Sequence, residues 1–461
     1  MSNPFLLTIV ASFLVSSSLA FQAQQAAPRG PVPARLQHLA PCFQSSTTSA
    51  DGNEMVFVQT LQDQQSKLRE LCAGLEIATE LVVGEDSDGI RGLYVGSSSD
   101  GIAEGSPILS VPLSSCLRDD EPPSWFQLNG EGEEEHSSNS YSAGSEWATR
   151  LAASLIDLRH LKPTSDQLSG WISMLPDAAN LRASLPIHWP SDVLQSAKCQ
   201  PLELAVDSVY FGRANAVMDL SEALKGLGGS GIDQYSDDEL TRLCHDALDI
   251  VQTRTCRVNL GDEEGHEVQL RLLAPVFDLL NHGPSANAGF ALEADADGKS
   301  VLVVRAVRAI ARGEEVFISY GDSSTTPAWK CLLSYGFVPN LDIADERNTV
   351  ELVVDGARAN VGADNVPFEL AEAAAAALAD AEGRVLKETD EIFTSEVARR
   401  IAKRAAEEAS DVTSKEDGKI SASSDENVAI SISLAQALRI SQRRVLESWS
   451  SSLLSFADAN S

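Results

Sequence analysis

The stretch VFDLLNHGPSANAGF, residues 276–290, places an Asp, an Asn and a His within five positions at the end of an apolar run. Asp278, Asn281 and His282 thus offer a carboxylate, an amide and an imidazole close together, and Asn287 follows. Taken alone, an Asn-His pair is more often a helix cap or a hydrogen-bonded turn than a functional site. The chemistry of this stretch therefore has to be judged from what surrounds it.

The composition is that of an acidic globular protein. The chain has 461 residues, of which 43% are hydrophobic, so it is long enough for two or three domains with buried cores. Its 35 Lys and Arg stand against 67 Asp and Glu, which gives a formal net charge of -32. Such a charge repels phosphate backbones and favours basic protein segments. Direct binding of DNA or RNA is therefore not expected.

The sequence contains no pattern typical of a metal site or a hydrolase. Its seven cysteines include no CxC or CxxC pair, so we expect them to be reduced and mostly buried, without a zinc cage or a dense disulfide framework. Cys244, His245 and His266 lack partners at ligand spacing, and neither GxSxG nor HExxH occurs. The segment GLGGSG, residues 226–231, lacks the Lys-Ser/Thr of a nucleotide-binding loop and is interpreted as a linker.

The first fifty residues have the composition of targeting segments. Residues 1–20 contain an apolar run and end in small residues, which is typical of a signal peptide. The run is too short to span a bilayer comfortably, so stable membrane insertion is not expected. Residues 21–50 lack Asp and Glu and are expected to be a disordered, transit-like segment. This order resembles the bipartite plastid presequence of algae with secondary plastids; a secretory or cytoplasmic location is the alternative.

Past residue 50, strand-like and helix-like segments alternate in blocks. Residues 75–117 and 268–320 contain short β-rich runs separated by Gly turns. Between these blocks, and again after residue 365, apolar residues recur at helical spacing. The polar stretches 129–145, 225–239 and 410–427 lack an apolar period and are expected to be solvated loops.

The two β-rich blocks share a short motif. GIAEGSPILSV (101–111) and AIARGEEVFIS (309–319) both contain Ile-Ala-x-Gly followed by an apolar strand, and glycine permits a tight reversal. We interpret them as one hairpin used twice in a sheet that the helical segment splits. Within that segment, residues 147–161 and 239–258 are predicted to be amphipathic helices that face a core.

The motifs along the chain resemble the SET-domain protein methyltransferases. The resemblance is carried by DGIRGLYVGSSSDGIAEGSPILSVP, LLAPVFDLLNH, GEEVFISYG and WKCLLSYGFVP. More narrowly, the chain is similar to the Rubisco large-subunit methyltransferase group, which lacks the zinc-binding cysteines of histone-directed relatives. The resemblance implies an α+β fold: a pseudoknotted SET β-fold over residues 51–340, with a helical insert at about 146–258. An all-helical substrate-binding domain is then expected over 341–461, with a flexible loop at 410–427.

The same resemblance implies S-adenosylmethionine-dependent methylation of a nitrogen on a protein side chain, with lysine as the expected acceptor residue. A non-histone protein such as the Rubisco large subunit or an aldolase is the substrate that family analogy suggests. Methyl transfer is an in-line displacement, so catalysis is chiefly alignment, which can contribute roughly 7–11 kcal/mol. Because a free lysine amine has a reference pKa of about 10.4, the site must favour the neutral amine. A narrow apolar channel beside a positive sulfonium does this.

The resemblance also assigns roles to individual residues. Tyr320 matches the catalytic tyrosine, and because a phenol of pKa about 10 is a poor base at neutral pH, we expect it to orient the methyl group and the amine. Asp278 and Tyr335 are expected to line the lysine pocket. The residues expected to contact S-adenosyl-L-methionine are Arg91, Gly92, Leu93, Arg254, Asn281, His282 and Phe337.

The chain departs from relatives at a few positions. Ala328 stands where relatives have an Asn, Cys256 stands where they often have an aromatic residue, and about three additional residues separate Tyr320 from Tyr335. We expect these changes to alter the cofactor site and the pocket. Two alternatives remain open: methylation of a histidine, and a non-catalytic SET fold that docks a partner through its helical domain. The sequence predicts no particular oligomeric state.

Overall fold

The structure, a computed structural model, describes residues 53–86, 90–96, 100–126, 146–161, 166–228, 231–261, 267–283, 285–320, 326–339, 348–362, 366–382, 391–412 and 426–459. The expected signal and transit segments lie outside these residues. So do the loop at 129–145 and most of the loop at 410–427.

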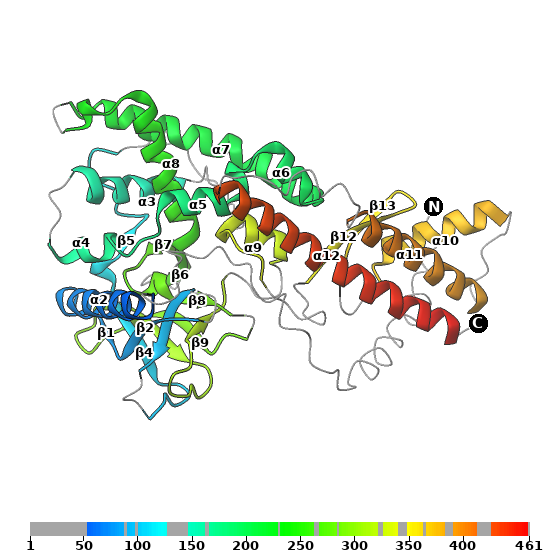
Figure 1. Cartoon of the computed structure of the whole chain (residues 1–461), viewed down its shortest axis with the longest axis horizontal. Coiled ribbons are helices and arrows are strands. Elements are labelled where there is room, and N and C mark those ends of the chain that lie inside the picture. The colour runs from blue at the N-terminus through cyan, green and yellow to red at the C-terminus, as the bar shows by residue number, and fades with distance from the viewer. Residues whose placement is uncertain are drawn as a thin grey trace.

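Short strands from two separate parts of the chain form the β-fold (Figure 1). The first part provides β1 (Ala78–Thr79), β2 (Leu81–Glu85), β3 (Arg91–Val95), β4 (Pro107–Pro112) and β5 (Leu117–Arg118). The second part provides β6 (Cys256–Gly261), β7 (Glu267–Leu273), β8 (Asn281–His282), β9 (Ala288–Ala294), β10 (Ser300–Ala306) and β11 (Phe317–Ile318). The two β-rich blocks expected from the sequence are confirmed.

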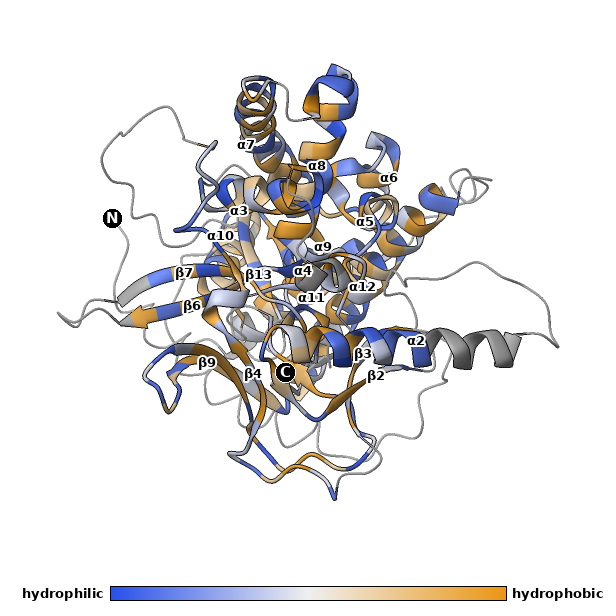
Figure 2. Cartoon of the chain, turned by 90° about the vertical axis from the view of Figure 1, so that its left-hand side faces the viewer, coloured by the Kyte–Doolittle hydropathy of each residue, from blue (hydrophilic) through white to orange (hydrophobic). Residues whose placement is uncertain are grey.

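Strands from the two parts interleave in the sheets. One sheet has the order β1-β4-β10-β9 and another the order β5-β7-β6, while β2 pairs with β3 and β8 pairs with β11. Helix α2 (Asn53–Gly74) lies beside β2 and β3 (Figure 2), and the Val83 N–H donates to Gln65 Oε1 at 2.7 Å. Because β4 pairs with β10 and β5 pairs with β7, neither part of the chain can complete these sheets alone.

The repeated Ile-Ala-x-Gly motif forms two equivalent turns. Gly105 and Gly313 adopt positive φ angles of 78° and 76° at the same place in each turn. Ile102 and Ile310, one from each copy, are paired by two backbone hydrogen bonds of 2.9 Å. The prediction that the same turn occurs twice is correct. However, the two copies pair with one another and do not close two separate hairpins.

A helical insert separates β5 from β6, as expected. Its helices are α3 (Glu146–Ile156), α4 (Asp166–Ile172), α5 (Ala178–Ser184), α6 (Ser191–Ser196), α7 (Gln200–Lys225) and α8 (Asp237–Arg254), with a π-helical turn at Asp157–Leu161. A capping box of Ser236 and Glu239 fixes the start of α8. The helix expected over 239–258 is too long at its C-terminal end, because Thr255 is extended and Cys256 begins the pairing of β6 with β7.

The C-terminal region is helical, with one addition. Helices α10 (Phe368–Glu382), α11 (Glu391–Asp411) and α12 (Glu426–Ala459) follow a hairpin of β12 (Val350–Val354) and β13 (Ala357–Val361). This hairpin corrects the expectation of an all-helical region. Its signal in the sequence is the pair Asp355-Gly356, whose φ angles of 48° and 87° are typical of a two-residue hairpin turn.

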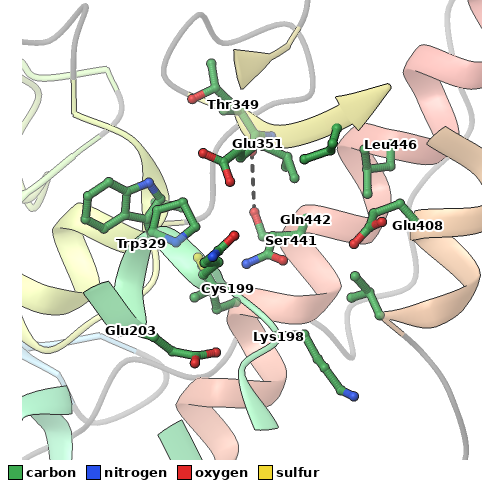
Figure 3. Close-up of a pocket in the computed structure, with 18 residues that line it drawn as sticks. Lys198, Cys199, Glu203, Trp329, Thr349, Glu351, Glu408, Ser441, Gln442 and Leu446 are labelled. Carbon is green, nitrogen blue, oxygen red and sulfur yellow. Dashed lines mark hydrogen bonds between the residues drawn. The ribbon is translucent and has the colours of Figure 1, made fainter. Parts of the chain in front are cut away.

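Helix α12 connects the C-terminal region to the insert (Figure 1). It contacts α5, α6 and α9 (Ala328–Tyr335) on one side of the junction and α11 on the other. A cavity of about 260 Å³ lies at this junction, between α7, α9, β12 and α12 (Figure 3). Ser441 Oγ of α12 lies 3.4 Å from Asn348 Oδ1 and donates a hydrogen bond to it.

In the described part of the chain, no helix is both long enough and apolar enough to cross a bilayer. The described cysteines are free thiols: Cys72 is partly exposed, whereas Cys116, Cys199, Cys244, Cys256 and Cys331 are buried. The expectation of reduced, mostly buried cysteines is confirmed for these six. Cys42 lies outside the described residues.

Candidate active site

Two short strands bring the end of the VFDLLNH stretch next to the ISYG motif. β8 and β11 pair in parallel, with Asn281 opposite Phe317 and His282 opposite Ile318. The Gly283 N–H donates to the Ile318 carbonyl at 3.1 Å. This pairing requires glycine at 283, because a Cβ there would lie 2.7 Å from the Cβ of Phe317.

Four rings form one cluster at this junction. The centroid of the Tyr320 ring lies 4.8 Å from that of Tyr335, 5.4 Å from that of His282 and 6.2 Å from that of Phe337. Helix α9 ends at Tyr335, and Gly336 takes a φ of 75°, which reverses the chain and lets Phe337 join the cluster. All four residues are half-buried, so the cluster is apolar and not fully enclosed.

Hydrogen bonds fix the position of Tyr320. Its hydroxyl donates to the Leu280 carbonyl at 2.6 Å, and its backbone N–H donates to His282 Nδ1 at 3.1 Å. Because Nδ1 accepts this bond, the proton of the neutral imidazole is on Nε2. Burial raises the pKa of Tyr320 to about 12, although the charge of Arg254 opposes the shift. The phenol is therefore neutral at physiological pH.

One side of the site, which we call the Glu315 wall, consists of Tyr94, Asn281 and Glu315. The Asn281 amide donates to the Arg91 carbonyl at 2.9 Å and to Glu315 Oε1 at 2.8 Å. The Tyr94 hydroxyl donates to Glu315 Oε2 at 2.9 Å. A Cβ at Gly92 would collide with Glu315 Oε1, so glycine makes room for this carboxylate. Both amide hydrogens of Asn281 are used inside the protein, which leaves its carbonyl oxygen as the atom to accept from a ligand.

A second side, the Asp278 wall, consists of Asp278, Trp171, Arg91 and Arg254. Asp278 is 4% exposed; its Oδ2 accepts from Trp171 Nε1 at 3.3 Å, whereas Oδ1 has no hydrogen-bond partner among the described residues. Arg254 donates to the Asp278 backbone carbonyl and Arg91 to the Met174 carbonyl, both at 2.7 Å. Burial raises the pKa of Asp278, against the charges of Arg254 and Arg91. The wall therefore offers an unsatisfied carboxylate oxygen beside two cations.

The turn that presents Asp278 is strained. Val276 is fully buried and has a φ of 70° and a ψ of -44°, a conformation that β-branched residues rarely adopt. Strain of this kind costs about 1–3 kcal/mol and is concentrated at functional sites. A short 3-10 turn, Phe277–Leu279, follows directly and carries Asp278. The strain and the unsatisfied oxygen thus fall within one short segment.

The residues assigned by the resemblance lie in the ring cluster and the two walls, except Gly92 and Leu93. Gly92 borders the Glu315 wall, because a Cβ there would lie 2.1 Å from Glu315 Oε1. The Leu93 side chain is fully buried in the main core, and a contact of this residue with the cofactor stays a prediction. Of the positions that depart from relatives, Ala328 begins α9 and packs in the core shared with α12, and Cys256 is buried on β6. Their expected effect on the cofactor site and the pocket stays a prediction.

Trp171, Tyr94 and Glu315 belong to the site, although the sequence does not single them out. Glu315 carries no clear signal, because it follows Glu314 and stands just before the apolar run that begins at Val316. Trp171 and Tyr94 carry none, since their partners are distant in sequence. Among the described residues, no group of three or more His, Cys, Asp or Glu side chains is placed to hold a metal ion.

Comparison with known proteins identifies the fold. Residues 98–321 match the family profile of the SET domain. The solved SET domain of LSMT bound to lysine and AdoHcy aligns with a TM-score of 0.50 and 14% identity, covering 85% of this chain and 91% of that chain. The same domain bound to MeLysine and AdoHcy gives a TM-score of 0.51 and 14% identity, covering 86% and 93%.

One further solved structure aligns with a lower score. Rubisco LSMT bound to AdoMet aligns with a TM-score of 0.48 and 14% identity, covering 86% of this chain and 93% of that chain. No curated protein sequence gives a significant match. The family match and the two structural alignments of higher score together show that this chain has the SET fold.

Proposed function

We propose that this chain, in which residues 98–321 form a SET domain, is an S-adenosylmethionine-dependent protein-lysine N-methyltransferase. One observation carries the proposal: the Tyr320 backbone bonds to His282, 38 residues away, so that the tyrosine hydroxyl, the Asn-His pair and two further rings share one site. The similar LSMT structures contain lysine or methyllysine together with AdoHcy, which supports lysine as the acceptor.

The residues present fit S-adenosylmethionine. The Arg254 guanidinium, beside Asp278, is suited to hold the carboxylate of the cofactor, since a guanidinium fork matches a carboxylate. The Asn281 carbonyl oxygen can accept from the adenosyl or amino groups, and the Phe337 ring can cover the adenine. When bound, the cofactor supplies an electrophilic methyl group on a sulfonium sulfur.

The remaining site residues bind, dehydrate and orient the lysine amine. The incoming ammonium donates to Asp278 Oδ1, and the raised pKa of this carboxyl suits it to take up the proton. The rings of Tyr320 and Tyr335 exclude water and disfavour a charge on the nitrogen. With S-adenosylmethionine bound, Asp278 and the two rings would present the neutral nitrogen to the methyl group that the cofactor supplies.

The Tyr320 hydroxyl contributes alignment and not proton transfer. Its proton is held by the Leu280 carbonyl, and its raised pKa keeps the phenol neutral. The oxygen lone pairs remain to accept weak CH···O contacts from the polarised methyl group. With the cofactor bound, such contacts would let Tyr320 orient the methyl group toward the acceptor nitrogen, and positioning of this kind has a large effect on rate.

The test compares wild type with Tyr320→Phe in two assays. Calorimetry measures binding of S-adenosylmethionine, which should persist in the variant because the ring is retained. Transfer of a labelled methyl group to proteins of a plastid extract should fall by about 100-fold or more, the usual effect of removing one preorganised polar group. Hydrolysis of the labelled protein should release methyllysine.

Each alternative has its own signature in this experiment. Methylhistidine in the hydrolysate would replace lysine by histidine as the acceptor. Cofactor binding without transfer above the level of Tyr320→Phe would identify a non-catalytic binding module. Absence of cofactor binding by the wild-type chain would refute the proposal itself.

We also propose that the protein acts in a plastid of a secondary-plastid alga, on a non-histone protein. The support is the composition of residues 1–20 and 21–50, together with the free thiols among the described cysteines, which suit a reducing compartment. A fluorescent protein fused behind residues 1–50 should enter the plastid of such an alga. Retention in the secretory pathway would contradict this destination without touching the proposed activity.

A further inference from the structure

Helix α7 is anchored in the protein through one face. Val206 and Val209 belong to the core shared with α9 and α12, and Leu220 and Leu224 belong to the main core. Arg213 lies on the same face, 1% exposed, in an ion pair with the fully buried Asp249. A helix buried through one face normally exposes polar residues on the opposite one.

The outer face of α7 instead exposes large apolar side chains. Leu204, Phe211 and Met218 are 59%, 72% and 58% exposed. Because they are seven residues apart, close to two helical turns, they form one stripe along the helix. Ser208 and Asn215 occupy the positions between them on this stripe and leave gaps between the large side chains. Figure 1 shows α7 along the upper edge of the molecule.

This exposure is concentrated on α7. Of the six large hydrophobic residues that are exposed in the described part of the chain, four are on this helix, since Tyr210 is also 60% exposed. The other two are Val307, directly after β10, and Leu454, on α12. Apolar surface gathered on one element is typical of an interaction site, whereas scattered exposed residues are ordinary.

Acidic side chains border the stripe. Asp207 and Asp219 are exposed on its two sides, and Glu222 is exposed at its end. The basic residues of α7 do not offset them, because Arg213 is buried and Lys225 is paired with Asp237 at 2.8 Å. At the start of the helix, Glu203 lines the cavity of Figure 3. The outer face of α7 is therefore apolar along its middle and negative along its edges.

We propose that the outer face of α7 is a docking surface for a cationic amphipathic helix of a partner protein. Leucine-sized side chains of such a helix would enter the gaps at Ser208 and Asn215, and its Lys or Arg residues would meet the acidic borders. A second copy of this chain fits less well, because paired α7 helices would oppose like charges in a chain of net charge -32. Docking at α7 does not depend on methyl transfer.

The experiment uses two synthetic helical peptides and the full chain. Both peptides carry leucine at heptad positions a and d; one has lysine at the flanking e and g positions and the other has glutamate. In fluorescence anisotropy at low salt, the lysine peptide should bind about tenfold or more tightly than the glutamate peptide. Phe211→Ser should weaken its binding by about tenfold or more, since a central aromatic anchor is lost.

Matched variants separate docking from general attraction to an acidic protein. Val307→Ser changes a residue that is 54% exposed elsewhere and should leave lysine-peptide binding unchanged. The double change Asp207→Lys with Asp219→Lys should reverse the preference toward the glutamate peptide. Equal loss in Phe211→Ser and Val307→Ser, or no preference between the peptides, would overturn the proposal. A wild-type dimer in sedimentation that Phe211→Ser converts to a monomer would assign the face to a second copy instead.

Discussion

The Glu315 wall and the Asp278 wall each contain a carboxylate, half-buried at Glu315 and buried at Asp278, and the hydrogen bonds of the two carboxylates differ. Both oxygens of Glu315 accept hydrogen bonds, one from Asn281 and one from Tyr94. Asp278 receives one bond from Trp171 and keeps an unsatisfied oxygen. Burial raises the pKa of both groups; hydrogen bonds oppose the shift at Glu315, and at Asp278 the charge of Arg254 is the main opposing influence.

This difference separates framework from ligand site. A buried carboxylate whose oxygens are satisfied within the protein stabilises the fold and has little left to offer a ligand. A buried oxygen without a partner costs free energy in the folded state, and a ligand that donates to it recovers that cost. The strain at Val276, next to Asp278, adds to the cost on the same side. Folding therefore satisfies the carboxylate of the Glu315 wall, and we infer that ligand binding satisfies the free oxygen of the Asp278 wall.

The largest effect is expected for Asp278→Asn, which tests the Asp278 wall. Asparagine keeps the acceptor for Trp171 but cannot take up a proton, so kcat/KM for the substrate protein should fall by about 100-fold. The free energy of unfolding at pH 7 should stay constant or rise. The folded pKa of Asp278 is raised, so its ionised form destabilises the fold above the unfolded pKa, and asparagine removes that penalty.

Asp157→Asn is the matched control for that experiment. Asp157 is also buried and also accepts from a tryptophan, with Trp125 Nε1 at 2.9 Å from its Oδ1, but it lies in the π-helical turn outside the two walls. Its replacement should leave kcat/KM unchanged. Asp278→Asn could also lower the free energy of unfolding by as many kcal/mol as its loss of kcat/KM represents. Asp278 would then be a framework residue, and the two walls would not differ in role.

Glu315→Gln should show the opposite behaviour, with loss of stability as the primary effect. A glutamine offers one acceptor and one donor where two donors, Asn281 and Tyr94, need acceptors. One donor is then left facing another, which should lower the free energy of unfolding by about 2–3 kcal/mol in urea titration. Glu314→Gln, the neighbouring change, removes a more exposed pair with Arg308 and should cost about 1 kcal/mol or less.

Gly92→Ala tests the same wall by steric means, with a smaller expected cost. The resemblance names Gly92 as a cofactor contact, and in the structure a Cβ at this residue would lie 2.1 Å from Glu315 Oε1 and 2.8 Å from Asn281 Nδ2. The Glu315 side chain can shift at its end, so we expect a loss of about 1–2 kcal/mol in the free energy of unfolding. Gly289→Ala on β9, whose Cβ would lie 3.5 Å from Val307, is the control and should be close to neutral.

Features that follow from local sequence patterns were predictable. The strand blocks and the insert each rest on a periodicity or on turn residues close in sequence, whereas the ring cluster, whose members come from separate segments, was expected from the family resemblance. The pair Asp355-Gly356 shows that one local signal, the β12–β13 hairpin, was also open to prediction. The end of α8 was harder, because Thr255 is extended only where β6 can pair with β7.

Features that depend on distant partners were not predictable from one sequence. Tyr94 and Glu315 are 221 residues apart, and Trp171 and Asp278 are 107 residues apart. No periodicity links such positions, so the number of possible partners is large. The sequence places Asp278 in a pocket by resemblance, but only the folded chain distinguishes its unsatisfied oxygen from the satisfied pair at Glu315.

The smallest effect is expected on α8, whose last residue, Arg254, belongs to the Asp278 wall. One turn earlier, Asp249 is satisfied by Arg213 and His188, as Glu315 is by its partners. His245 is next to this cluster, and its pKa is lowered to about 4 by burial and by the charges of Arg213 and His188. In the unfolded chain His245 therefore takes up a proton near the usual histidine pKa of about 6.5, whereas in the folded chain it does so only near pH 4.

His245→Gln should remove this one source of acid sensitivity. From pH 7.5 down to about pH 6.5, the free energy of unfolding should change equally in wild type and variant. Between pH 6.5 and pH 4, it should fall further in the wild type than in the variant, by about 1 kcal/mol or less after allowance for solvent screening. Urea unfolding across this range measures the difference. Parallel curves for the two proteins would mean that His245 titrates in the folded state as it does in the unfolded one. The cluster around Asp249 would then be accessible to solvent protons, in contrast to the Glu315 wall.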